Sequence, residues 1–188
     1  MKILMIGAGG TIGKMVTPAL KGHEVITVGR NTGDITADIS LEVAVDNLFN
    51  RVSNIDAVIC TAGDSVTDNL SKMNKDQFMV GIHQKLCLQI NLVLSGMKYL
   101  KDNGSFTLIS GKMGEFPVNG SSGKALVNGA INSFVMAAAQ EMPRGIRLNV
   151  ISPSKVSDID ENELIEAYVR CLETAINGEI IRVGYNKQ

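Results

Sequence analysis

The chain has 188 residues, a length that suits one domain and is ample to bury one sizeable core. Hydrophobic residues make up 45% of it and aromatic residues only 4%, so aliphatic side chains and Met are expected to fill the interior. A formal net charge of -1 offers no general attraction to a polyanion, which argues against a nucleic-acid partner. The longest apolar runs have the length of strands, so we expect no membrane association and a cytoplasmic protein.

Cysteine and histidine are too scarce and too scattered to suggest a metal site. Cys60, Cys87 and Cys171 form no CxxC pair, so neither a disulfide framework nor a zinc site is indicated. His23 and His83 are the only imidazoles, too few for a histidine cluster. We therefore predict buried thiols and no metal.

Strand-like and helical segments alternate along the chain. The first half predicts, in order, a strand at 2–6, a helix at 11–21, strands at 23–28 and 34–39, a helix at 41–52 that Ser40 could cap, and a strand at 54–60. The second half predicts a helix at 75–100, a turn at 101–104, a strand at 105–110, a helix at 121–141, a strand at 145–152, a helix at 161–177 and a strand at 179–183.

This alternation predicts an α/β fold in a single domain spanning residues 1–188. Strands joined through helices run parallel, by right-handed crossovers, with helices on both faces. The result is a doubly wound, Rossmann-like sheet in three α/β/α layers, whose ligands bind at the carboxyl ends of the strands. Loops 111–123 and 152–160 each follow a strand directly and are long enough to be functional.

A glycine-rich turn joins the first strand to the first helix. It consists of Gly7, Ala8, Gly9, Gly10, Thr11, Ile12 and Gly13. Glycines let backbone amides approach a pyrophosphate closely, and a helix N-terminus adds free N–H groups and a positive dipole end. The spacing departs from Gly-x-Gly-x-x-Gly, because Ile12 stands where that pattern has its third Gly. A dinucleotide is the expected ligand; the alternative is a turn that only reverses the chain.

At this turn the chain resembles the short-chain dehydrogenase/reductase family. The likeness continues at Thr61-Ala62-Gly63, at Ser110 and at Ile151-Ser152-Pro153, each directly after a predicted strand, and so covers nearly the whole chain. The resemblance implies about seven strands in the order 3-2-1-4-5-6-7 and a nicotinamide cofactor. It also implies that Ala62 and Gly63 lie along the cofactor's ribose and that Pro153 contacts the cofactor.

The residues after the second strand favour NADP(H) over NAD(H). An NAD-preferring protein places Asp or Glu there, to bond the adenosine ribose. This chain has Arg30 followed by Asn31, and a guanidinium pairs well with a 2′-phosphate. A solvated surface arginine is the alternative. By resemblance, the carboxylate of Asp38 would take the adenine amine and Ile39 would cover the ring, although helix capping competes as the role of that region.

The catalytic pattern of the family is incomplete here. The family uses a Tyr as general acid, a Lys four residues later and a Ser that orients the substrate oxygen; the corresponding residues are Gly120, Lys124 and Ser110. Lys85 stands where the family commonly has an Asn. Loss of a general acid costs about two to four orders of magnitude in rate, while hydride transfer resides in the cofactor. Lys85, Lys112, Lys124 or a bound water could donate the proton.

Two functions therefore stay open. The first is an NADP(H)-dependent oxidoreductase of a small carbonyl or alcohol, with Ser110 on the substrate and Lys124 on the cofactor ribose. The second is a protein that binds or senses NADP(H) without turnover. The apolar faces of helices 75–100 and 121–141 match those through which relatives pair, so a homo-oligomer, dimer or tetramer, is expected; alternatively both faces only cover the sheet.

Overall fold

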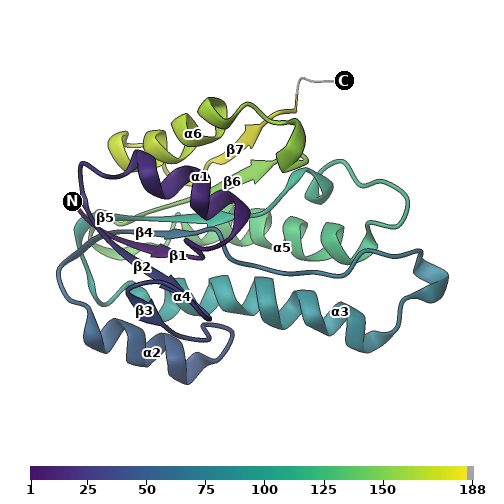
Figure 1. The fold of residues 1–188 in the computed structure, drawn as a ribbon, viewed down its shortest axis with the longest axis horizontal. Helices are drawn as coiled ribbons and strands as arrows, with labels where there is room; N and C mark the ends of the chain where they lie inside the picture. Colours follow the sequence, from purple (N-terminus) through teal and green to yellow (C-terminus); the bar gives the residue numbers. More distant parts are fainter. Residues whose placement is uncertain (186–188) are drawn as a thin grey trace.

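A computed structural model describes residues 1–185, and its centre is one parallel sheet (Figure 1). The strands lie in the order β3-β2-β1-β4-β5-β6-β7, which confirms the predicted order. Their bounds are β1 Lys2–Ile6, β2 Glu24–Gly29, β3 Ile35–Thr36, β4 Ile55–Cys60, β5 Leu100–Ile109, β6 Arg147–Pro153 and β7 Ile180–Val183. Every neighbouring pair of these strands is parallel, as alternation with helices requires.

Helices cover both faces of the sheet. They are α1 Thr11–Ala19, α2 Glu42–Arg51, α3 Lys75–Gly81, α4 Leu88–Gly96, α5 Ser122–Ala138 and α6 Glu161–Glu173. In Figure 1, α1 and α6 lie on one side of the strands, and α2, α4 and α5 lie on the other. The predicted three-layer α/β/α arrangement is confirmed.

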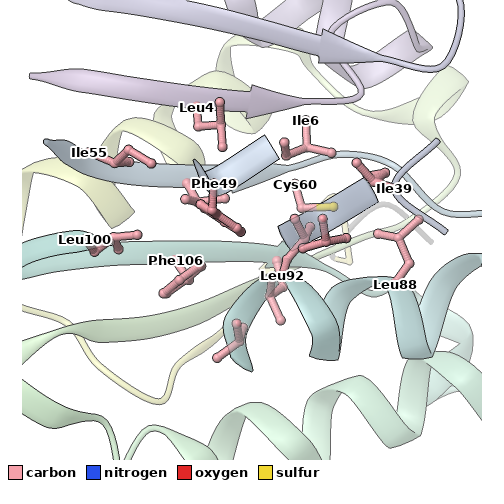
Figure 2. Close-up of a cluster of buried hydrophobic side chains, with 14 of the residues drawn as sticks. Leu4, Ile6, Ile39, Phe49, Ile55, Cys60, Leu88, Leu92, Leu100 and Phe106 are labelled. Atoms are coloured by element: carbon pink, nitrogen blue, oxygen red, sulfur yellow. The ribbon is translucent and has the colours of Figure 1, made fainter. Parts of the chain in front are cut away.

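Side-chain alternation along the strands divides the core into two parts. In β1, Leu4 and Ile6 belong to the cluster beneath α2, α4 and α5, whereas Ile3 and Met5 belong to the cluster beneath α1 and α6. All four side chains are fully buried, which explains why the strand reads as an unbroken apolar run. Figure 2 shows the first cluster, where the ring of Phe49 from α2 lies among side chains of the sheet and of α4.

Two predictions near the third strand are wrong. Only Ile35–Thr36 forms a strand; before it, the Asp34 carboxylate accepts hydrogen bonds from the backbone N–H and hydroxyl of Thr27 in β2. Ser40 does not cap α2. Its hydroxyl donates to Asp38 at 2.7 Å, and the N-cap residue is Leu41.

The segment predicted as one helix over 75–100 has a more complex course. It contains α3, a π-helical turn at Ile82–Cys87 and α4, which ends at Gly96. A Cβ on Gly96 would lie 2.5 Å from the Phe49 ring, so the close packing of that ring requires a glycine. Residues 101–104, predicted as a turn, lie within β5, where the register against β4 shifts and Asn103 has a φ of 61°.

Among residues 1–185, no helix is both long and apolar enough to cross a membrane, and no cluster of potential ligands suits a metal ion. The three cysteines are free thiols, with Cys60 and Cys171 buried and Cys87 partly exposed.

Candidate functional site

The turn from β1 to α1 is closely packed and leaves its amides open. Gly7 has a φ of +83°, and a Cβ there would meet the Ala62 nitrogen at 2.8 Å. A Cβ on Gly13 would come within 2.2 Å of the Gly7 carbonyl oxygen. Within the described chain no side chain caps the start of α1, and its first turn holds no acidic residue. The free N–H groups and positive dipole end of this helix therefore remain available to an anion.

A small cavity of about 220 Å³ opens beside this turn, at the carboxyl ends of β1, β2 and β4. Six of the predicted cofactor residues line it: Gly7, Arg30, Asp38, Ile39, Ala62 and Gly63. Gln84 and Leu88 from the other side of the cleft also line it, and sequence reasoning had missed both. The positions of Gln84 and Leu88 at this cavity depend on how the π-helical turn and α4 pack on the sheet.

Arg30 and Asp38 lie together at the rim of the small cavity. The Arg30 Nε is 3.6 Å from an Asp38 carboxylate oxygen, and both side chains are substantially exposed. The hydrogen bond from the Ser40 hydroxyl holds the pKa of Asp38 below its usual range, and the nearby guanidinium charge adds to this effect. Asp38 is therefore a carboxylate whose position is set by Ser40 and Arg30 together.

The remaining predicted cofactor residues do not line this small cavity. Gly9, Gly10, Thr11 and Gly13 belong to the backbone of the turn, and Asn31 is an exposed loop residue. Thr32, which sequence reasoning had missed, packs on the turn, because a Cβ on Gly9 would lie 2.8 Å from its hydroxyl.

A larger cavity of about 740 Å³ continues from the turn across the ends of β4, β5 and β6. The predicted residues that line it are Ile12, Gly63, Lys85, Ser110, Lys112, Lys124 and Pro153. These residues come from six separate parts of the chain, and the parallel topology brings them to one end of the sheet.

Ser110 supplies a buried hydroxyl to the larger cavity. The residue is only 3% exposed, and its Oγ has no hydrogen-bond partner among the described residues. Its backbone N–H donates to the Ile151 carbonyl at 2.9 Å, which fixes the residue to β6. A buried hydroxyl that lacks a partner costs free energy, so this one is available to bond a ligand.

Lys85 projects from the π-helical turn into the same cavity. Its ammonium donates a 2.9 Å hydrogen bond to the carbonyl oxygen of Ser110. The pKa of Lys85 is lowered to about 8, chiefly by burial; the Lys124 charge contributes to this shift, while Cys60 and Asp64 oppose it. π-Helical turns are frequent at functional sites because they redirect side chains. Lys85 is thus a cation that can release a proton near neutral pH.

Lys124 and Asn128 are one turn apart on α5 and both line the larger cavity. Asn128 is 4% exposed, and its Oδ1 has no partner within the described part of the chain. A Cβ on Gly111 would lie 2.9 Å from the Asn128 Nδ2, so Gly111 makes room for this amide. Sequence reasoning had missed Asn128, although the spacing of four residues from Lys124 was a usable signal.

Gly120, aligned above with the family's Tyr, does not line the larger cavity. It precedes the start of α5 by two residues and has a φ of +78°, a conformation that side-chain-bearing residues rarely adopt. Gly120 is therefore in a turn before α5 and not in a helical segment that would carry a Tyr one turn before Lys124.

Comparisons with known proteins agree with this architecture. A family model described as "Enoyl-(Acyl carrier protein) reductase" matches residues 13–177. An uncharacterized oxidoreductase of Staphylococcus epidermidis is 21% identical, over 87% of this chain and 84% of its own length.

Solved structures share the fold closely. A crystal structure of a Listeria innocua protein is 36% identical, with a TM-score of 0.93, covering 97% of this chain and 98% of that one. A small-chain dehydrogenase is 26% identical, with a TM-score of 0.89, covering 100% and 98%. A third structure, a small-chain dehydrogenase in complex with NADPH, is 24% identical with a TM-score of 0.87 over 97% and 96%, and shows the same fold. The chain belongs to the short-chain dehydrogenase/reductase family.

Proposed function

We propose that this protein reduces a small carbonyl compound with NADPH as hydride donor, or oxidises the corresponding alcohol with NADP⁺. The observation that carries the proposal is the Ser110 hydroxyl, buried and without a partner in the described chain, in a cavity that continues from the glycine turn. A protein that only binds the nucleotide would not need a buried, unpaired hydroxyl in the cavity beyond the glycine turn. Such a group fits a substrate oxygen.

The residues of the two cavities fit a dinucleotide. The start of α1 has no side-chain cap and no acidic residue in its first turn, so its free amides can bond a pyrophosphate. Arg30 at the rim of the small cavity supports the choice of NADP(H), because its terminal nitrogens can bond a 2′-phosphate while Nε faces Asp38. Ile39 offers an apolar wall for the adenine, and Lys124 a donor for the nicotinamide ribose.

The chain's own groups complete the chemistry around the substrate carbonyl. When bound, the dihydronicotinamide supplies a hydride to the carbonyl carbon. The Ser110 hydroxyl donates a hydrogen bond to the carbonyl oxygen, which orients the bond and stabilises the developing negative charge. The Lys85 ammonium gives its proton to that oxygen, so an alcohol forms and the neutral amine recovers a proton from water.

Lys85 suits the role of acid that the family's Tyr usually fills. Its lowered pKa places it near the pH at which a general acid is most effective. Its bond to the Ser110 carbonyl keeps the ammonium beside the residue that orients the substrate. The second nearby cation, Lys124, favours release of the Lys85 proton.

NADPH oxidation with a panel of small aldehydes, ketones and quinones tests the proposal. We expect turnover by the wild-type protein and a loss of about two to four orders of magnitude in Lys85→Met. A Lys21→Met variant, which removes an exposed lysine outside both cavities, serves as the matched control. Tight NADPH binding without oxidation of any panel member would instead identify a binding or sensing protein.

Pairing of copies through α4 and α5 stays a prediction. Leu94, Leu126 and Met136 on these helices are each about half exposed, at 50%, 47% and 47%, which is consistent with an apolar contact surface. Light scattering of the purified chain would measure the number of subunits.

A further inference from the structure

Lysines outnumber carboxylates in the wall of the larger cavity. Its ionisable lining consists of four lysines and two aspartates: Lys85, Lys112, Lys124, Lys155, Asp64 and Asp158. Lys155 lies 4.0 Å from Asp158, so these two charges offset each other. Of the other three lysines, Lys85 is assigned above to proton transfer and Lys124 to the cofactor ribose, which leaves Lys112 without a role.

Lys112, like Lys85 and Lys124, makes no salt bridge to a carboxylate among the described residues. Its ammonium lies 5.4 Å from the centre of the Tyr185 ring, and the Tyr185 hydroxyl is fixed by a 2.7 Å bond with Ser152. The nearby Glu115 is already engaged, because Arg182 donates two hydrogen bonds to its carboxylate at 3.0 and 2.5 Å. Lys112 is thus positioned by an aromatic face and not neutralised by a carboxylate.

The backbone places Lys112 next to the proposed carbonyl site. Gly111 has a φ of 162° and a ψ of 156°, which is extended, so the flanking Ser110 and Lys112 side chains lie on the same side of the chain. Extended residues two apart are separated by roughly 6.6 Å, a span that the lysine side chain can partly close. Lys112 therefore stands two residues from Ser110 in the wall of the same cavity.

A second unpartnered group faces the same space. The Asn128 Oδ1 is buried and has no hydrogen-bond partner within residues 1–185, and the residue lines the larger cavity together with Ser110 and Lys112. Apolar side chains complete the wall: Met113, Phe116, Val118 and Val156. The cavity therefore combines a cation, two unused polar groups and an apolar surface.

We propose that the substrate carries a carboxylate beside its carbonyl group, as an α-keto or β-keto acid does, and that Lys112 binds this carboxylate. The inference rests on the proposed function, since it deepens the account of the same site. Lys112 donates to the carboxylate, Ser110 donates to the ketone oxygen, and the apolar wall takes a short carbon chain. The excess of lysines over aspartates in this wall also raises the local concentration of an anionic substrate.

Matched acids and esters test the proposal. The probes are pyruvate with methyl pyruvate and acetoacetate with methyl acetoacetate, measured both as substrates in NADPH oxidation and, by calorimetry with NADP⁺ present, as ligands. We expect each acid to exceed its ester by about 10-fold or more in kcat/KM and in affinity, because a charge-assisted hydrogen bond is lost in the ester. In Lys112→Met this ratio should fall to about one, while Lys112→Arg should keep most of it.

Lys21→Met is the control for a loss of positive charge elsewhere, and should retain the wild-type ratio. Equal values for acids and esters, a preference that survives in Lys112→Met, or failure of the acids to bind would each overturn the proposal. The two measurements separate it from the proposed function. Lys112-dependent binding of the acids without NADPH oxidation would contradict the reductase activity alone, whereas turnover of acids and esters at equal rates would contradict only the carboxylate.

Discussion

A Cβ atom on Gly63 would lie 2.6 Å from the Cγ of Lys85 and 3.1 Å from its Cδ. Because Gly63 has no side chain, the aliphatic part of Lys85 can pass beside it and reach the Ser110 carbonyl. Gly63 was predicted from resemblance to contact the cofactor ribose. In the structure it also packs against the Lys85 side chain.

We expect Gly63→Ala to displace Lys85 and to lower NADPH-dependent turnover by about 10- to 100-fold, with a stability loss of roughly 1–3 kcal/mol from overpacking. Steady-state kinetics and thermal unfolding measure the two effects. Gly22→Ala is a suitable control, because a Cβ there meets nothing within 4 Å. Unchanged kinetics in Gly63→Ala would show that the position of Lys85 does not matter.

The rate of reduction should fall as the pH rises through about 8. Burial lowers the pKa of Lys85 to that value, and only the protonated form can donate to the substrate oxygen. Alcohol oxidation should show the opposite trend, because the neutral amine then accepts the proton. A pH profile of kcat/KM in both directions measures this, and a profile that stays the same in Lys85→Met would assign the ionisation to another group.

Lys85 should also make folding stability depend on pH. Its pKa in the folded chain, about 8, is below its ordinary value of 10.5, so the unfolded chain binds more protons between these values. Stability should therefore rise with pH across this window, and the full cost of burying the ammonium applies below pH 8.

Lys85→Met removes that cost while it keeps the apolar stem, so it should stabilise the protein near neutral pH by roughly 1–3 kcal/mol. Denaturant unfolding of both proteins on either side of pH 8 measures the difference. A destabilised variant would indicate that the bond to the Ser110 carbonyl outweighs the cost of burial.

Removal of Arg30 should weaken the binding of NADPH much more than the binding of NADH. We expect Arg30→Ala to raise the Kd for NADPH by about 10- to 100-fold and to leave the Kd for NADH nearly unchanged, since only the former offers a 2′-phosphate. Calorimetry with both nucleotides measures this, and Arg51→Ala tests for general loss of an exposed positive charge. Equal affinities of the wild-type protein for both nucleotides would remove the argument for phosphate recognition.

Gly13→Ala should weaken both the turn and nucleotide binding. The added Cβ would lie 2.2 Å from the Gly7 carbonyl oxygen and 2.7 Å from the Ala8 Cα, both of which are backbone atoms. Moving the first turn of α1 away from β1 should destabilise the fold by about 2 kcal/mol or more and raise the Kd for NADPH at least about 10-fold. Thermal unfolding with and without NADPH measures both, and retention of wild-type affinity would contradict the role of this turn.

The sequence by itself determined the order of strands and helices, the glycine turn and the family. These features depend on local patterns: apolar runs of strand length, helical spacing, and glycines where the chain must turn closely. The unbroken run of β1, for example, follows from burial on both faces of the sheet. The capping pattern failed at Ser40 because two local roles competed: its hydroxyl bonds Asp38, two residues earlier, instead of capping α2.

Only the tertiary structure decided how the residues of the candidate active site are brought together. Lys85 reaches Ser110 across 25 residues of sequence because a π-helical turn redirects it and Gly63 leaves room for its stem. Asn128 and Lys112 enter the same cavity through packing of α5 and through an extended Gly111. Apart from the four-residue spacing of Asn128 from Lys124, these relations have no local signature, since they depend on where parallel strands end and on which polar atoms are left without partners when the core closes.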